Sequence, residues 1–151
     1  MLLRTHLMFG ILMIIIFIMH VNNKIVFPIM VIIATILPDL DTGFSTLGKK
    51  WYAKPFQIFV KHRGVIHSLT TAVVISVIIA IFFPIASLGF FIGYSVHIIT
   101  DSFTKEGVQP FWPLKTKSRG FIRTGGKVED SVFLGMILIN IVVFLIVFIL
   151  G

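Results

Sequence analysis

Long apolar runs constrain the fold of this chain more than any other feature. They cover residues 7–21, 25–37, 69–99 and 132–150, and none contains Lys, Arg, Asp or Glu. Because about 20 apolar residues suffice to cross a bilayer as a helix, the run over 69–99 is too long for one crossing. Phe83-Pro84 lies near its middle, and proline interrupts a helix. The composition agrees, since 57% of residues are hydrophobic and 13% are charged, against about 25% charged in soluble domains. The sequence therefore predicts an integral membrane protein.

The fold class predicted from these runs is all-α, a single transmembrane helical domain over 1–151 built as a bundle of about five helices. The residues Asn22-Asn23-Lys24 favour a tight turn between the first two helices. The N-terminus is similar to a signal peptide in having Arg4 before an apolar segment, but residues 20–24 offer no small-residue cleavage site. We therefore expect the first helix to be retained. The expected helices are about 3–21, 25–38, 66–83, 86–102 and 131–150.

The basic residues predict how this bundle is oriented. Five crossings place the N-terminus and the 39–65 and 103–130 loops on one side, together with all 13 Lys and Arg residues except Lys24. The positive-inside rule makes that side cytoplasmic, which predicts a multi-pass protein of the plasma (inner) membrane. The net charge of +7 then records topology, and we expect no nucleic-acid partner. Trp51, Tyr52 and Trp112 lie on the same side and are interpreted as interface anchors.

Acidic and histidine side chains gather at the cytoplasmic ends of the predicted helices, which indicates a polar site at that face. All six acids and every histidine except His20 fall on this side. The chain has no cysteine, so a metal must be held by imidazole and carboxylate groups. His97 and Asp101 are four residues apart, which places them on one helix face. The candidate ligands are His6, Asp39, Asp41, His67, His97 and Asp101, for one or two divalent ions, with zinc expected first and manganese or magnesium as alternatives.

Each of these motifs also has an explanation that needs no metal. The carboxylates of Asp39 and Asp41 point the same way if Pro38 is followed by extended chain, but Asp-x-Asp also occurs in ordinary turns. A His and an Asp at a helix end can simply bond to each other or to water, and His6 can reach the interface as an amphipathic side chain. In Glu129-Asp130-Ser131, Asp130 and Ser131 are interpreted as a helix cap. Glu129 is left open between a role in this cap and a role in the metal site.

Taken together, the motifs carry a family resemblance. His6, LPDLDT at 37–42, HRGVIHS at 62–68, GYSVHIITDSFTKEGVQPFWP at 93–113 and Glu129 resemble the LexA-binding, inner-membrane-associated family of metal-dependent hydrolases over nearly the whole chain. The resemblance implies a small multi-span membrane enzyme that uses a metal. Its His and Asp motifs look distantly like those of zinc-dependent phospholipase C. No particular substrate is implied.

The sequence thus predicts a metal-dependent hydrolase at the cytoplasmic membrane face. A bound divalent ion lowers the pKa of its water to about 7. His62 or Glu129 would take or return the proton, and a phosphate would be neutralised by Arg63, Arg119 and Arg123. The nearest substrate is an ester or phosphoester of a membrane lipid, and the next a soluble phosphoester. The sequence does not indicate an oligomeric state.

Two alternatives belong to other functional classes. A non-catalytic scaffold or lipid-binding protein could use the same ions structurally. A small cation carrier would need a polar path through the bilayer, and the helices offer mainly Ser76 and Asn140 for it.

Overall fold

The computed structural model describes residues 1–41 and 65–150, and this part of the chain is helical. It contains five α-helices and two short helical segments of other types. No strand occurs in the described ranges, where the only β-type pairing is a pair of isolated bridges in the loop after residue 102. The predicted all-helical class is confirmed for these residues. The elements are α1 (Leu3–Phe17), α2 (Val26–Ile36), η1 (Leu37–Asp41), α4 (Leu69–Phe82), α5 (Pro84–Ser102), α6 (Lys127–Leu145) and η3 (Ile146–Leu150).

Capping chemistry explains where the helices in the middle of the chain begin. Ser68 caps α4 by accepting the backbone N–H of Thr71 at 3.1 Å, so this helix begins at Leu69 and not at 66. Pro84 is the first residue of α5, two residues before the predicted start. Proline is favoured at this position because the first N–H of a helix has no partner within the helix. The break in the apolar run is therefore a sharp corner between two helices.

The predicted cap of the last helix is wrong. Gly126 occupies the N-cap position and α6 begins at Lys127, which puts Asp130 at the end of the first turn and Ser131 in the second. The Ser131 hydroxyl donates back to the Lys127 carbonyl at 3.1 Å and caps nothing. Asp130 instead forms an ion pair with Arg4 of α1. The first helix also ends earlier than expected, at Phe17.

The segment after α2 differs from the prediction as well. Residues Leu37–Asp41 form a short 3₁₀ helix instead of extended chain, since the fixed φ of Pro38 suits a first helical turn. Positions 39 and 41 consequently do not share a face as they would in a strand. The structure places Asp39 against the bundle, with 9% of its surface exposed, whereas the Asp41 side chain lies outside the described part.

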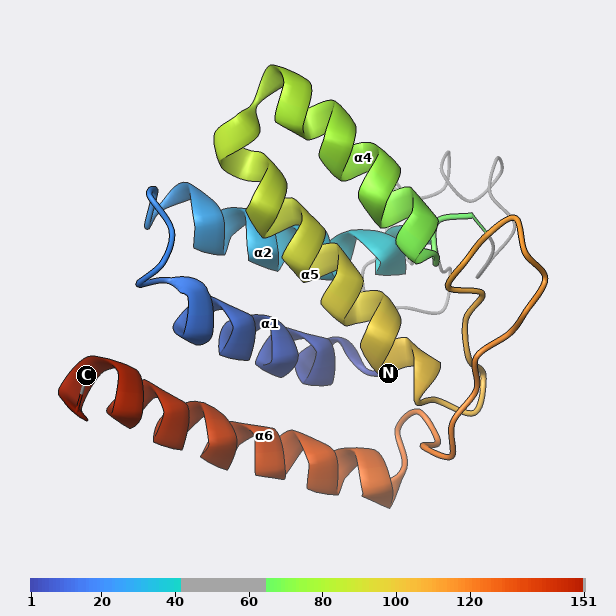
Figure 1. Cartoon of the computed structure of the whole chain (residues 1–151). Coiled ribbons are helices and arrows are strands. Elements are labelled where there is room, and N and C mark those ends of the chain that lie inside the picture. The colour runs from blue at the N-terminus through green and yellow to red at the C-terminus, as the bar shows by residue number, and fades with distance from the viewer. Residues whose placement is uncertain (42–64, 151) are drawn as a thin grey trace.

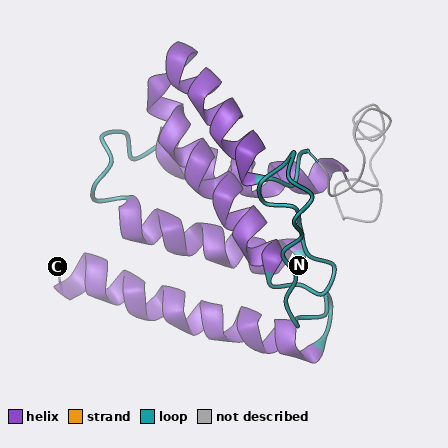
Figure 2. Cartoon of the chain, turned by 45° about the vertical axis from the view of Figure 1, so that its right-hand side comes forward, coloured by secondary structure: helices purple, strands orange, loops and turns teal. Residues whose placement is uncertain are grey.

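Helix α5 is the centre of the arrangement. It contacts α1, α2 and α4, while α6 packs along α1, as Figure 1 shows. The N-terminus, the end of α5 and the start of α6 lie at the same end of the molecule, next to the loop that joins α5 to α6 (Figures 1 and 2). This convergence brings together the ends of helices that are far apart in the sequence.

Two glycines allow α2 and α5 to approach closely. A Cβ atom on Gly93 would lie 2.3 Å from the Val31 carbonyl oxygen, and one on Gly89 would lie 2.8 Å from the Phe27 carbonyl oxygen. The two are four residues apart on α5, the small-xxx-small spacing that lets helix backbones touch in membranes. Across this contact the Thr35 hydroxyl reaches the Gly93 carbonyl at 3.3 Å. The register between α2 and α5 is thereby fixed.

Large apolar side chains cover much of the outer surface of the bundle. Examples are Val77 and Ile81 on α4, which are 55% and 70% exposed, and Leu138 on α6, which is 66% exposed. Apolar surface on this scale normally faces a partner or a membrane. Among the described residues one helix, Lys127–Ile149, has the length and composition to cross a bilayer, and three others, α1, α2 with most of η1, and α4, are apolar but shorter.

Candidate metal centre

Five of the predicted ligands meet inside the bundle at the end where the helices converge. His6, His67, His97 and Asp101 are at most 2% exposed and Asp39 is nearly buried. They form two overlapping groups, His6 with Asp39 and His97, and His67 with His97 and Asp101, in each of which the ligand atoms lie within 4.8 Å of one another. α1, η1, α5 and the segment before α4 each contribute at least one residue. His97 belongs to both groups and stands at the centre.

The spacing of the ligand atoms fits a divalent ion. The Nε2 atoms of His6 and His97 lie 3.2 and 3.8 Å from Asp101 oxygens, and His97 Nε2 lies 3.8 Å from Asp39 Oδ1. His67 Nε2 lies 4.0 Å from Asp101. Zinc binds nitrogen and oxygen at about 2.0 to 2.2 Å, so two neighbouring ligands of a tetrahedral ion are about 3.4 Å apart. The observed separations between ligand atoms, from 3.2 to 4.0 Å, lie on both sides of that value.

Hydrogen bonds on the far side of two imidazoles direct their lone pairs into the cluster. His97 Nδ1 lies 2.7 Å from the Thr35 carbonyl oxygen, which can only accept, so Nδ1 carries the hydrogen. In a neutral ring this leaves Nε2 with its lone pair, and that atom has no hydrogen-bond partner among the described residues. A partner on the second ring nitrogen that fixes the tautomer is typical of metal-binding histidines.

His6 is oriented in the same way by Thr100. Its Nδ1 lies 2.8 Å from Thr100 Oγ1. The hydroxyl hydrogen of Thr100 is directed to the helix carbonyls of Val96 and His97, each at 2.9 Å, so the oxygen is left to accept from His6. The His6 ring also stacks on that of His97, with centroids 4.0 Å apart. Both imidazoles therefore present Nε2 to the carboxylates.

The electrostatics of the cluster favour a cation. Burial raises the pKa of Asp39, and the nearby His6 opposes this shift only in part. Asp101 accepts a hydrogen bond from the amino group of Met1. A divalent ion would stabilise both carboxylates and reverse the effect of burial on Asp39.

Replacing Thr100 tests how the His6 ring is held. Thr100→Val keeps the shape of the side chain and removes the only oxygen that accepts from His6 Nδ1 in the described contacts. Loss of such an outer partner lowers metal affinity by about 10 to 100-fold, measured by competition with a chromogenic chelator. Thr100→Ser should restore the affinity. A valine variant that binds as tightly as the native protein would contradict this role for Thr100.

Two of the predicted arginines lie outside the cluster, and the side chains of three other predicted site residues fall outside the described part of the chain. His62 and Arg63 lie outside the described residues, as does the Asp41 side chain. Arg119 and Arg123 are exposed in the loop between α5 and α6, and no metal-binding group includes them.

Glu129 is buried but belongs to neither metal group. Its two oxygens accept backbone N–H groups, from Leu2 at 2.5 Å and from Gly125 at 2.7 Å, and its exposure is 0%. Its interpretation as a proton acceptor finds no support in these contacts. The carboxylate instead ties the segment before α1 to the loop before α6, and so positions the N-terminal side of the cluster.

Sequence reasoning missed the two threonines that orient the histidines. A hydroxyl and a main-chain carbonyl are the outer partners of the histidines, and neither residue was among the candidates drawn from the sequence. Thr100 precedes Asp101 directly, which is a weak signal. Nothing in the sequence distinguishes Thr35 from an ordinary helix residue, because its contact with His97 depends on how α2 and α5 pack.

The fold and this cluster define a class of protein, a small helical protein with an apolar exterior and a buried His and Asp site of metal-binding composition. The chain belongs to the YdjM inner membrane protein family, which matches it over residues 1–150. The inner-membrane location and the resemblance to an inner-membrane family are thereby supported, whereas the LexA-binding part of that resemblance stays a prediction.

Individual relatives agree with this assignment. The inner membrane protein YdjM of Escherichia coli strain K12 and that of Shigella flexneri are each 34% identical over 100 residues, covering 58% of this chain and 50% of theirs. The chain thus spans about half the length of these relatives. The uncharacterized protein YvsG of Bacillus subtilis strain 168 is 25% identical over 122 residues, covering 77% of this chain and 76% of its own. No solved structure matches the chain.

Proposed function

We propose that this protein is a metal-dependent hydrolase of the inner membrane that cleaves an ester or phosphoester at the cytoplasmic face. The observation that carries the proposal is the pair of buried imidazoles, His6 and His97, whose Nε2 atoms are directed at Asp101 and Asp39 by fixed partners on their Nδ1 atoms. Such an arrangement costs free energy in a bundle core unless a cation compensates it. Zinc fits the nitrogen and oxygen ligands best, with manganese or magnesium as alternatives.

The proposal gives each part of the chain a role. His6, Asp39, His67, His97 and Asp101 hold one or two ions. A bound ion acts as a Lewis acid and lowers the pKa of a water molecule to about 7. His62, five positions before His67 in the sequence, is the proposed proton acceptor, because an imidazole titrates near neutral pH.

The surrounding basic residues supply the proposed membrane orientation and substrate class. On this proposal the helices cross the membrane several times, with the N-terminus and the loops around 42–64 and 103–126 on the cytoplasmic side. Arg119 and Arg123, both exposed, together with Arg63, would then face the lipid headgroups. Their guanidinium groups suit the paired oxygens of a phosphate. A phosphoester of a membrane lipid is consequently the proposed substrate class, followed by a soluble phosphoester.

A hydrolysis assay tests the proposal directly. Protein purified in detergent should hydrolyse phospholipid in mixed micelles, lose this activity after dialysis against a chelator, and regain it when zinc is added. His97→Ala should reduce the rate to background because it removes the central ligand. His20→Ala is the matched control, since His20 is exposed in the turn at the opposite end of α1. Equal rates with and without chelator, across several ester and phosphoester substrates, would end the hydrolase proposal.

One observation favours a second candidate, a metal-stabilised membrane scaffold without catalysis. The cluster contains five side chains that could each bind a metal. Catalytic zinc sites commonly use three protein ligands and keep a position for water. If one ion were enclosed by all five, its role would be structural. In that case chelation should unfold the protein, and no hydrolysis should accompany metal binding.

A further inference from the structure

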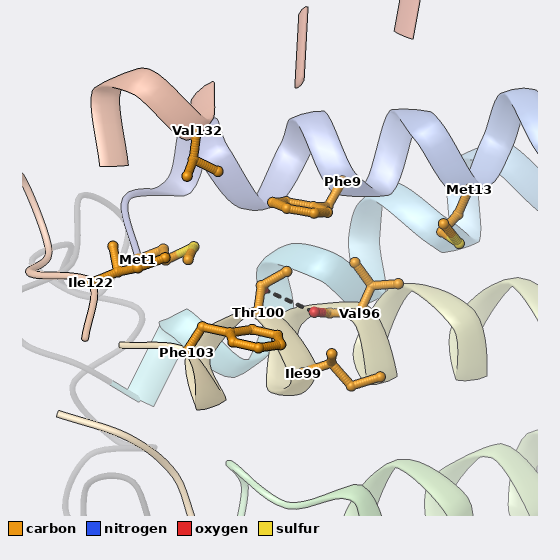
Figure 3. Close-up of a pocket in the computed structure, with 9 residues that line it drawn as sticks. All are labelled: Met1, Phe9, Met13, Val96, Ile99, Thr100, Phe103, Ile122 and Val132. Carbon is orange, nitrogen blue, oxygen red and sulfur yellow. Dashed lines mark hydrogen bonds between the residues drawn. The ribbon is translucent and has the colours of Figure 1, made fainter. Parts of the chain in front are cut away.

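An apolar cavity of about 420 Å³ borders the candidate metal centre. It lies between α1 and α5, with contributions from the start of α6 and from the loop before it, as Figure 3 shows. The volume is within the range of about 300 to 1,000 Å³ that is typical of small-molecule sites. Apart from Thr100, each residue of its wall is apolar. The Thr100 hydroxyl already donates to the Val96 carbonyl and accepts from His6 Nδ1. The cavity therefore offers little to a polar ligand.

The cavity and the cluster share a wall. Thr100 lines the cavity and holds His6 on its other side at 2.8 Å. Met1 also lines the cavity, and its amino group contacts Asp101. One end of the apolar space therefore lies one residue away from the proposed metal ligands.

The residues that line the cavity are spread along two helices and extend away from the cluster. On α5 it is lined at positions 96, 99, 100 and 103, which is one face of a helix. On α1 it is lined by Phe9 and Met13, and Figure 3 shows these side chains facing Val96 across the space. From Thr100 the lining runs past Phe9 to Met13, toward the middle of the bundle. Methionine side chains adapt readily to flexible apolar ligands.

The rim is open to the apolar exterior, and one basic residue follows the lining in the chain. Ile99 and Phe103 are 48% and 52% exposed, so a ligand can enter from the side that a bilayer would cover. Ile122 closes the end near the cluster, and the next residue, Arg123, is exposed. An apolar cavity with an exposed guanidinium one residue beyond its lining is complementary to an acyl chain that carries an anionic head.

We propose that this cavity binds one acyl chain of an anionic phospholipid and so places the ester or phosphoester of that lipid against the metal centre. The inference rests on the proposed hydrolase function for its consequence, but the binding itself does not require catalysis. It makes a long-chain lipid the substrate and a soluble phosphoester a poor one.

The test is crosslinking with a phosphatidylglycerol that carries a photoactivatable diazirine near the end of one acyl chain. In native protein the label should appear on peptides from α1 and α5 that include Met13 and Ile99. Met13→Trp fills the far end of the cavity, away from the metal ligands, and should reduce this labelling at least tenfold without changing the bound metal. Leu138→Trp is the control, because Leu138 is an exposed apolar residue of α6 outside the cavity lining.

Activity then separates the two proposals. With a long-chain substrate Met13→Trp should hydrolyse at least tenfold more slowly than Leu138→Trp, while a short-chain soluble phosphoester should react equally with both. Labelling confined to the cavity in a protein that hydrolyses nothing would support the acyl-chain site and contradict the hydrolase. Labelling spread evenly over the exposed helix faces, and unchanged by Met13→Trp, would overturn the acyl-chain site whatever the activity.

Discussion

Asp101→Asn should abolish metal binding. The two oxygens of Asp101 lie near three histidines, at 3.2 Å from His6, 3.8 Å from His97 and 4.0 Å from His67. The asparagine amide has the same shape but carries no charge, and its nitrogen cannot bind a cation. Even outer partners of metal ligands contribute about 10 to 100-fold in affinity, so we expect this substitution at the centre to cost more than about 100-fold.

Elemental analysis of detergent-purified protein measures this effect without any assumption about substrate. The native protein should retain a divalent metal in a fixed ratio to the chain, and Asp101→Asn should retain background levels. Asp130→Asn is the matched control, because Asp130 pairs with Arg4 at the surface and belongs to neither metal group. A native protein that carries no metal after loading, or an Asp101→Asn variant that carries the native amount, would contradict the candidate metal centre.

Gly93→Ala should damage both the stability of the bundle and its metal site. The added Cβ would lie 2.3 Å from the Val31 carbonyl oxygen and 2.9 Å from the Val31 Cα atom. Both contacts are with backbone, so no side chain can rotate away, and α2 must shift. Overpacking of this kind lowers the free energy of unfolding by about 1 to 3 kcal/mol. The same shift would move the Thr35 carbonyl away from His97 Nδ1, which it contacts at 2.7 Å.

Thermal unfolding in detergent and metal content together measure this prediction. Gly135→Ala on α6 is the control, since nothing lies within 4 Å of a Cβ placed there, and alanine is a better helix former than glycine by about 0.8 to 1.0 kcal/mol. The control should therefore be as stable as the native protein or more so. If Gly93→Ala unfolded at the same temperature as Gly135→Ala and kept its metal, the close contact of α2 with α5 would contribute neither to stability nor to metal binding.

Local signals predicted the helices well because they act over short distances along the chain. The uninterrupted apolar runs required helices, and Pro84 fixed the corner between two of them. The errors fall at helix ends, where several local signals compete. The acids at 129 and 130 fit a helix N-terminus, but Gly126 four residues earlier became the cap. After Pro38 the sequence left extended chain and an ordinary turn open, and the backbone geometry of proline suits the first turn of the 3₁₀ helix that forms there.

The candidate site was predictable in its members and not in its arrangement. His6, Asp39, His67, His97 and Asp101 were chosen because they fall at helix ends on one predicted side, and the structure brings these five together. Glu129 was chosen for the same reason, yet it bonds to backbone groups of Leu2 and Gly125. Position at a helix end brings a side chain to the correct level of the bundle, but the rotation of the helix decides what the side chain meets.

The sequence alone determined that this chain carries helix-length apolar runs and has imidazole and carboxylate groups as its only strong metal ligands. These properties follow from residue type and spacing, which the chain carries in any conformation. Tertiary structure alone decided that Thr35 and Thr100 orient the histidines, that Glu129 faces backbone, and that an apolar cavity borders the cluster. Each of these depends on contacts between helices distant in the sequence, and the close approach of α2 to α5 at Gly93 sets the register from which the central contact, between Thr35 and His97, follows.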